Sequence, residues 1–193
     1  YRSGDVLYDV MKLALPSGRE IEAILRSLGL QKSHYLLLTL HRAGAVDDKV
    51  SLQRFIKLTA AIQEPTIFPL HPRTRRRLRQ FGLMNKLRSN RHLKLIDPCG
   101  YREMLALTSG ARMVLTDSGG LQREAYRLRV PVLLLRNATE WVEIIKAGGG
   151  LVVGDDVDLL RRGSGKKTFQ FRDRAFCRTG AAQRIARRLT NLS

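Results

Sequence analysis

The sequence predicts an α/β protein, a Rossmann-like parallel sheet with helices on both faces. Short apolar runs recur along the chain and alternate with amphipathic, helix-like segments. These runs are apolar at nearly every position, which indicates strands that are buried on both faces. Hydrophobic residues make up 44% of the 193 residues, which is enough for one domain with a substantial core.

The expected elements follow in a regular order. Strands are predicted at residues 35–40, 66–70, 93–96, 113–116, 132–135 and 151–153. Helices are predicted at residues 5–15, from 17 to a stop at 29, and at 50–62, 101–108, 120–128 and 181–189. We expect residues 1–30 to be a linker with helices that leads into a Rossmann-like domain of residues 31–193. The basic run 161–167 lacks the strand and helix context of a phosphate loop and is predicted to be a surface loop.

Charge and cysteine usage narrow the class of protein. The formal net charge is +18, which attracts nucleic acid, acidic membranes or phosphorylated ligands. Cys99 and Cys177 have no CxxC spacing, so neither a zinc site nor another metal site is expected. No apolar run is long enough to span a bilayer and no signal-peptide pattern opens the chain. We therefore expect a cytoplasmic protein without membrane contacts. The first residue is Tyr1 rather than Met, so we expect either that something was removed or that this is part of a longer chain.

The strongest basic cluster lies at residues 73–94. It has two interpretations: a nucleic-acid surface that makes phosphate contacts, or a solvated helical face. The second is favoured, because aromatic side chains for base stacking do not alternate with the basic ones. Nucleic acid is accordingly not the expected partner.

Polar or small residues follow most of the predicted strands. In a parallel sheet these positions share one edge, where ligands bind. They include His41 after the first strand, His71 after the second and Asp117 after the fourth. His41 is the preferred site histidine, whereas His71 could equally anchor its turn. Asp117 is expected to cap the helix that follows it.

The turn Ser118-Gly119-Gly120 joins a buried strand to a helix. A helix N-terminus presents free N–H groups and a positive dipole end, which bind phosphate or carboxylate. The glycines are expected to allow close approach of a ligand and backbone conformations barred to other residues. Glu124 could accept hydrogen bonds from the two hydroxyls of a ribose. The pattern thus suggests a nucleotide-diphosphate site, although a tight turn followed by a solvated glutamate remains the alternative.

Five motifs in order, TLHR, FPLHPRTR, LTDSGGLQREA, VPVLLLRNATEWVE and AGGGLVVG, resemble the C-terminal half of UDP-N-acetylglucosamine 2-epimerases. The resemblance implies a GT-B fold with the active site between two Rossmann-like domains, of which this chain is the UDP-binding one. It implies a catalytic role for His41 near the sugar–phosphate linkage. The residues that it implies for UDP binding are Ser118, Gly119, Gly120, Glu124, His71, Arg73, Gln122, Arg136, Thr139 and Glu140. The chain departs from the family pattern at Gly44, Ala45, Met104 and Arg178-Thr179.

The resemblance also implies a reaction. Family members interconvert UDP-N-acetylglucosamine and UDP-N-acetylmannosamine by elimination of UDP and its re-addition. The carboxylates that move the C2 proton belong to the N-terminal domain, so this chain alone is expected to be inactive. No cofactor is expected, and the complete enzyme could be a homodimer. A hydrolysing epimerase or a GT-B glycosyltransferase half, and a basic nucleic-acid-binding domain, are the alternatives.

Overall fold

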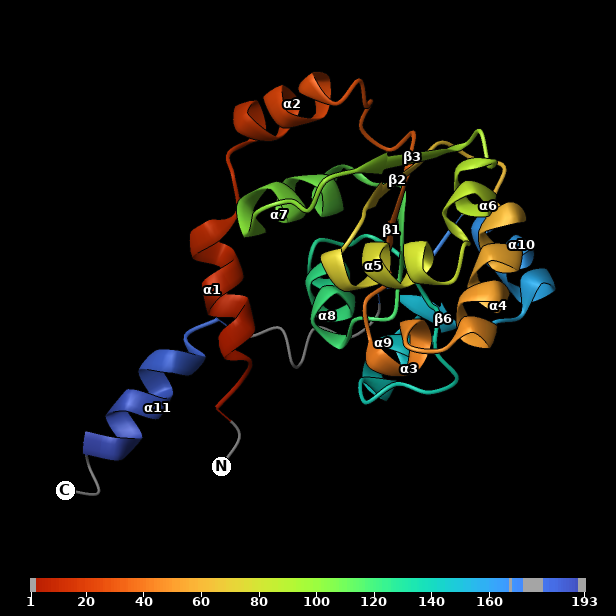
Figure 1. Ribbon diagram of the computed structural model, residues 1–193. Coiled ribbons are helices and arrows are strands. Elements are labelled where there is room, and N and C mark those ends of the chain that lie inside the picture. Colours follow the sequence, from red (N-terminus) through yellow and green to blue (C-terminus); the bar gives the residue numbers. More distant parts are fainter. Residues whose placement is uncertain (1–2, 167, 172–178, 191–193) are drawn as a thin grey trace.

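A six-stranded parallel sheet forms the centre of the molecule, as the sequence predicts (Figure 1). This computed structural model describes residues 3–166, 168–171 and 179–190. The strand order is β3-β2-β1-β4-β5-β6, with every neighbouring pair parallel. The strands are β1 (Leu36–Thr39), β2 (Thr66–Pro69), β3 (Leu93–Ile96), β4 (Met113–Thr116), β5 (Val132–Leu134) and β6 (Gly150–Val152).

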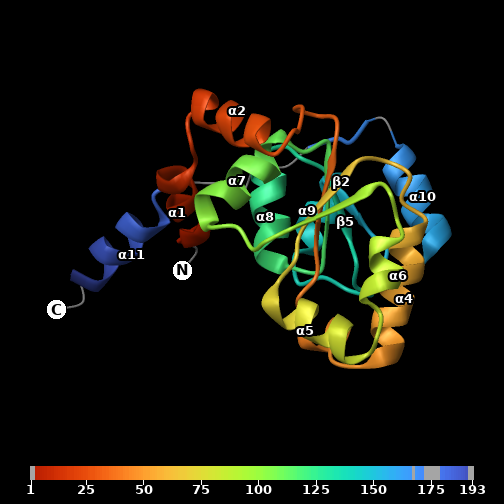
Figure 2. The same ribbon diagram turned by 45° about the horizontal axis from the view of Figure 1, so that its top comes forward.

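Helices cover both faces of the sheet (Figure 2). They are α1 (Val6–Ala14), α2 (Gly18–Ser27), α3 (Ala43–Val46), α4 (Lys49–Ala60), α5 (Pro72–Gln80), α6 (Met84–Arg88), α7 (Tyr101–Gly110), α8 (Gly119–Arg127), α9 (Val142–Lys146), α10 (Val157–Gly165) and α11 (Ala181–Thr190). Side chains of one strand alternate between the two faces. Leu36 and Leu38 of β1 accordingly pack with α4, α5, α6 and α10, whereas Leu37 packs with α2, α7 and α8.

The first helix is tied to α8 and to the last helix by charged side chains. Arg123 of α8 donates from Nη1 to both oxygens of Asp5 at 2.9 Å, and the guanidinium of Arg127 lies 3.4 Å from the ring centre of Tyr8. The carboxylate of Asp9 accepts hydrogen bonds from the N–H groups of Gly180 and Ala182. These arginines therefore hold α1 against α8, while the boundary at residue 30 stays a prediction.

The expectation for the run 161–167 is wrong. The run 161–167, expected to be a surface loop, lies mostly in α10, whose N-cap Asp156 accepts a hydrogen bond from the N–H of Leu159. Leu160 and Gly163 are buried against the sheet, and a Cβ on Gly163 would come within 2.9 Å of Leu133. Packing of this face outweighs the weak helix propensity of glycine and serine.

Some expectations fall outside the described residues, namely those on Lys167, Cys177 and Arg178. Among the helices that the structure does describe, none has the length and apolar character that a membrane crossing needs.

Candidate nucleotide site

The candidate site lies where the strand order reverses, between β1 and β4. At such a switch point the two crossovers run to opposite faces and leave a crevice at the carboxyl ends of the strands. His41 and Arg42 follow β1, and Asp117 and Ser118 follow β4. A buried hydrogen bond of 2.6 Å between the hydroxyls of Thr39 and Thr116 joins the last residues of the two strands.

Ser118 is the N-cap of α8. Its Oγ accepts a hydrogen bond from the N–H of Leu121 at 3.3 Å. Gly119 and Gly120 form the first turn, where N–H groups point out of the helix end. Neither glycine has a positive φ, so the expectation of a backbone conformation barred to other residues is wrong.

Space, rather than backbone conformation, explains Gly119. A Cβ there would lie 3.2 Å from Nε1 of Trp141 and 3.5 Å from both Arg42 Nη2 and Glu140 Oε2. A Cβ on Gly120 would meet nothing closer than the Ser118 hydroxyl at 3.7 Å. Side chains of the protein itself therefore occupy the space beside Gly119, and close approach of a ligand to this turn stays a prediction.

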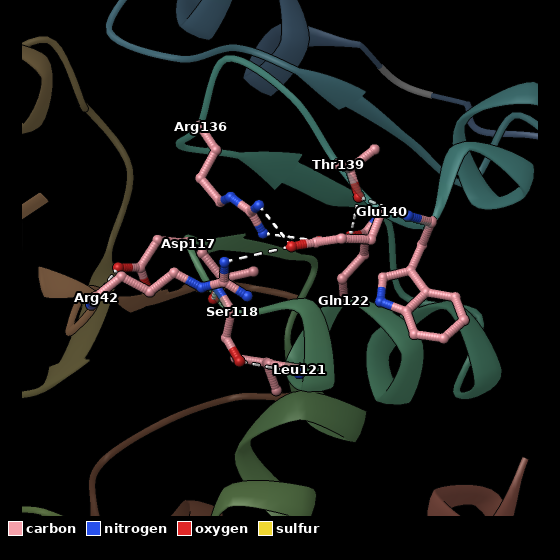
Figure 3. A network of polar contacts seen from close by, with 10 residues as sticks. Arg42, Asp117, Ser118, Leu121, Gln122, Arg136, Thr139 and Glu140 are labelled. Atoms are coloured by element: carbon pink, nitrogen blue, oxygen red, sulfur yellow. Dashed lines mark hydrogen bonds and ion pairs between the residues drawn. The ribbon is translucent and has the colours of Figure 1, made fainter. Parts of the chain in front are cut away.

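A network of charged side chains covers this helix end (Figure 3). Arg136 donates two hydrogen bonds to Glu140, at 3.0 and 2.8 Å, and Arg42 reaches the same carboxylate at 3.4 Å. The hydrogen bonds from Arg136 lower the pKa of Glu140 to about 2. The site thus places two guanidinium groups and one carboxylate beside the N-terminus of α8.

Glu124 lies about one turn further along α8 and is only 8% exposed. Its Oε1 accepts a hydrogen bond of 2.7 Å from the hydroxyl of Tyr101, the first residue of α7. Burial raises the pKa of Glu124, and it likewise raises the pKa of Tyr101. This acid is therefore neither a cap nor the solvated helix residue of the alternative interpretation. It already accepts a hydrogen bond from a hydroxyl group, that of Tyr101.

Asp117 does not cap α8, which corrects the sequence expectation. It is wholly buried, and its Oδ2 accepts the backbone N–H groups of His41 and Arg42 at 3.0 and 2.7 Å. Its other oxygen, Oδ1, lies 3.5 Å from Nδ1 of His41. Asp117 thus positions the loop after β1, because that loop offers it two N–H groups.

The two candidate histidines lie together, with ring centres 5.5 Å apart. His71 is the N-cap of α5, and its Nδ1 accepts the N–H of Arg73 at 3.2 Å. Burial lowers the pKa of His71, and the neighbouring charges of His41 and Arg73 lower it further. His71 therefore anchors its turn and also stands beside His41.

Three other predicted site residues engage the protein itself. The guanidinium of Arg73 pairs with Asp47, which follows α3. Gln122 is wholly buried, and its Oε1 accepts the hydroxyl of Thr139 at 2.7 Å. Gln122 and Thr139 thus fasten the loop after β5 to α8, and direct contact of these three residues with a nucleotide stays a prediction.

An open cavity of about 440 Å³ adjoins the switch point. Its lining includes Leu40, Arg42, Phe55, Asp117, Arg136 and Asn137. Sequence reasoning had not selected Arg42 or Tyr101, because their partners lie 98 and 23 residues away along the chain. In the part of the chain that the structure describes, no cluster of His, Cys, Asp or Glu side chains could hold a metal ion.

The strand order, the glycine-started helix at the switch point and the buried acid along it define a Rossmann-like α/β domain of the GT-B type. The UDP-N-acetylglucosamine 2-epimerase family model matches residues 1–190, and the chain belongs to this family.

Three similar proteins illustrate the relation. A UDP-N-acetylglucosamine 2-epimerase homolog of Methanococcus maripaludis is 42% identical over 83% of this chain and 45% of its own length. A UDP-2,3-diacetamido-2,3-dideoxy-D-glucuronate 2-epimerase of Pseudomonas aeruginosa is 38% identical over 82% of this chain and 45% of its own. The crystal structure of the Methanocaldococcus jannaschii UDP-GlcNAc 2-epimerase in complex with UDP-GlcNAc and UDP is 35% identical, with a TM-score of 0.82 over 98% of this chain and 54% of that chain. The chain thus spans about half the length of these relatives.

Proposed function

We propose that this chain is the UDP-binding half of a UDP-N-acetylglucosamine 2-epimerase. The observation that carries the proposal is the N-terminus of α8 at the switch point, with Gly119 and Gly120 in its first turn and the buried Glu124 about one turn along. A diphosphate bound at the helix end meets outward N–H groups and a positive dipole. Glu124 then takes the ribose hydroxyls in place of the Tyr101 hydroxyl.

Charge around the helix end supports the same assignment. Arg42 and Arg136 both reach Glu140, so two guanidinium groups stand where a bound diphosphate would carry its negative charge. The related M. jannaschii enzyme was crystallised with UDP-GlcNAc and UDP, which supports a uridine nucleotide as the ligand.

The proposed reaction is inversion at C2 of the sugar through elimination and re-addition of UDP. A departing UDP builds up negative charge on its diphosphate, and fixed N–H dipoles with a nearby cation stabilise that charge. His41 is the proposed catalytic residue beside the sugar–phosphate bond. The groups that move the C2 proton belong to the other half of the protein, so this chain alone binds UDP without turning over substrate.

Sugar, partners and location follow from the same assignment. The P. aeruginosa relative acts, by its name, on a different UDP-sugar, so the nucleotide end is the shared part of recognition. We assign N-acetylglucosamine as the sugar because the matching family model is named for it. The partners proposed are the remaining half of the protein and a second copy of the complete enzyme, in the cytoplasm.

The first experiment measures UDP binding by calorimetry. Ser118→Asp keeps an N-cap of equal quality but adds a carboxylate at the helix end. We expect the native chain to bind UDP more tightly than UMP, and Ser118→Asp to lose most of this difference. The matched control is Ser17→Asp, the same change at the N-cap of α2, which should bind as the native chain does. Equal UDP binding by Ser118→Asp and the native chain would refute the proposed diphosphate site.

A further inference from the structure

The two carboxylate oxygens of Asp117 face different groups of the loop 41–42. Oδ2 accepts the backbone N–H groups of His41 and Arg42. Oδ1 is buried and has no hydrogen-bond partner among the described residues, but His41 Nδ1 lies 3.5 Å away. A buried carboxylate oxygen needs a donor. A proton on His41 Nδ1, with a small rotation of the ring, supplies it.

We propose that Asp117 is a positioning residue that fixes His41 in the Nδ1–H tautomer and so directs the Nε2 atom of His41 into the site. In this tautomer neutral His41 offers the Nε2 lone pair as an acceptor. When the ring takes up a second proton, Nε2 becomes a donor while Nδ1 stays on Asp117. The carboxylate therefore holds one ring orientation in both protonation states, and proton exchange takes place at Nε2 alone.

His71 has the opposite arrangement. Its Nδ1 already accepts the N–H of Arg73, so neutral His71 carries its proton on Nε2. The ring centres of His41 and His71 are 5.5 Å apart, and the pair therefore offers one acceptor and one donor. Such a pair suits an oxygen that gains or loses a proton as UDP leaves and returns. This role of the histidine pair rests on the proposed function, whereas the assignment of the two tautomers does not.

Nitrogen-15 NMR of the free chain reads the tautomers directly. Neutral imidazole in water favours the Nε2–H form, so an Nδ1–H form at His41, whose side chain is 41% exposed, requires a specific acceptor. We expect Nδ1–H at His41 and Nε2–H at His71. His34 provides a reference, because its Nδ1 lies 2.8 Å from the carbonyl oxygen of Lys32 and must donate to it. A native chain with Nε2–H at His41 overturns the proposal without any variant.

Asp117→Asn then tests the cause. The amide can still accept one backbone N–H through its oxygen, but its NH₂ group donates toward His41 Nδ1. We expect neutral His41 to change to the Nε2–H form while His71 and His34 keep theirs. Asp97→Asn, at a carboxylate that pairs with Arg75 on the surface, should change none of them. Retention of the Nδ1–H form in a folded Asp117→Asn variant would show that Asp117 does not set it.

A UDP titration of the same native sample separates the two proposals. Absence of UDP binding together with the expected tautomers would refute the nucleotide site and still support the assignment of Asp117. UDP binding together with an Nε2–H form at His41 would overturn Asp117 as its positioning residue and leave the nucleotide site standing.

Discussion

Replacement of Glu124 by glutamine should weaken UDP binding while it leaves the fold intact. Glu124→Gln keeps the length and the acceptor oxygen of the side chain, so the hydrogen bond from the Tyr101 hydroxyl can persist. What it removes is the negative charge. A hydrogen bond to a charged group contributes about 1 kcal/mol more than one between neutral groups. With two ribose hydroxyls the loss is about 2 kcal/mol, or about 30-fold in Kd.

Calorimetry with UDP and 2′-deoxy-UDP tests this reasoning as a double-mutant cycle. If Glu124 accepts the ribose hydroxyls, removal of the 2′-hydroxyl should cost affinity in the native chain and much less in Glu124→Gln. Tyr101→Phe is the matched control, because it frees Glu124 from its internal donor and should keep or improve UDP affinity. Equal losses for the two ligands in both proteins would refute a direct contact between Glu124 and the ribose.

The same variant should show the opposite effect on stability. Burial raises the pKa of Glu124 in the folded protein above its usual value of 4.5. The favourable contribution of Glu124 to the free energy of unfolding is therefore complete below pH 4.5, and it is lost as the pH rises through the folded-state pKa. Measured by urea unfolding, the free energy of unfolding of Glu124→Gln should accordingly increase relative to that of the native chain between pH 4.5 and neutral pH. A binding acid that costs stability is expected of a functional site.

Three further predictions concern the surroundings of the site. Arg136→Gln should raise the pKa of Glu140 from about 2 toward 4.5, as followed by carbon-13 NMR, since Arg136 is the main cause of the shift; the stability that this ion pair provides is present above pH 4.5 and is lost as the pH falls toward 2. Arg123→Leu should lower the free energy of unfolding by about 2 kcal/mol, because it leaves the largely buried Asp5 without its ion-pair partner and removes the contact with Trp141. Arg26→Leu, on the exposed face of α2, is the control and should change the free energy of unfolding little. Gly150→Ala should cost about 3 kcal/mol in the same urea assay, because its Cβ would lie 2.3 Å from the carbonyl oxygen of Val132 in the neighbouring strand; Gly44→Ala meets nothing within 4 Å and should fold normally. Native-like urea midpoints for Arg123→Leu or Gly150→Ala, or an unmoved Glu140 titration, would contradict the respective contact.

Local patterns were sufficient for the strands. The runs at 93–96 and 113–116 are the observed bounds of β3 and β4, because all-apolar runs between helices have few other ways to be buried. The run 161–167 was misassigned because its glycines and serine oppose a helix locally, while the face with Leu160 packs on the sheet. Burial against the sheet determines that this segment is helical, and a local stretch of sequence does not show that burial.

The candidate site divides in the same way. Ser118 and Gly119 belong to one turn, so their proximity in the structure could be inferred from their adjacent positions in the sequence. The reason that position 119 lacks a Cβ nevertheless lies outside the turn, since Arg42, Glu140 and Trp141 converge on it from two other loops. Arg73 was assigned to UDP by the family resemblance; adjacent residues do not indicate its pairing with Asp47, and its contact with a ligand stays a prediction.

The strand order explains why Asp117 was assigned the wrong partner. With only the sequence, the residues that follow Asp117 are its nearest neighbours, and a helix cap is the natural role. The order β3-β2-β1-β4-β5-β6 instead places β4 beside β1, so the position after β4 faces the loop 41–42 across the switch point. A parallel sheet joined by helices admits other orders, and in any order that separated these strands Asp117 would be a buried carboxylate without its two N–H donors. A polar residue that is wholly buried at the end of one strand is therefore a constraint on which strand lies next to it, and here that constraint selects the neighbour that carries His41.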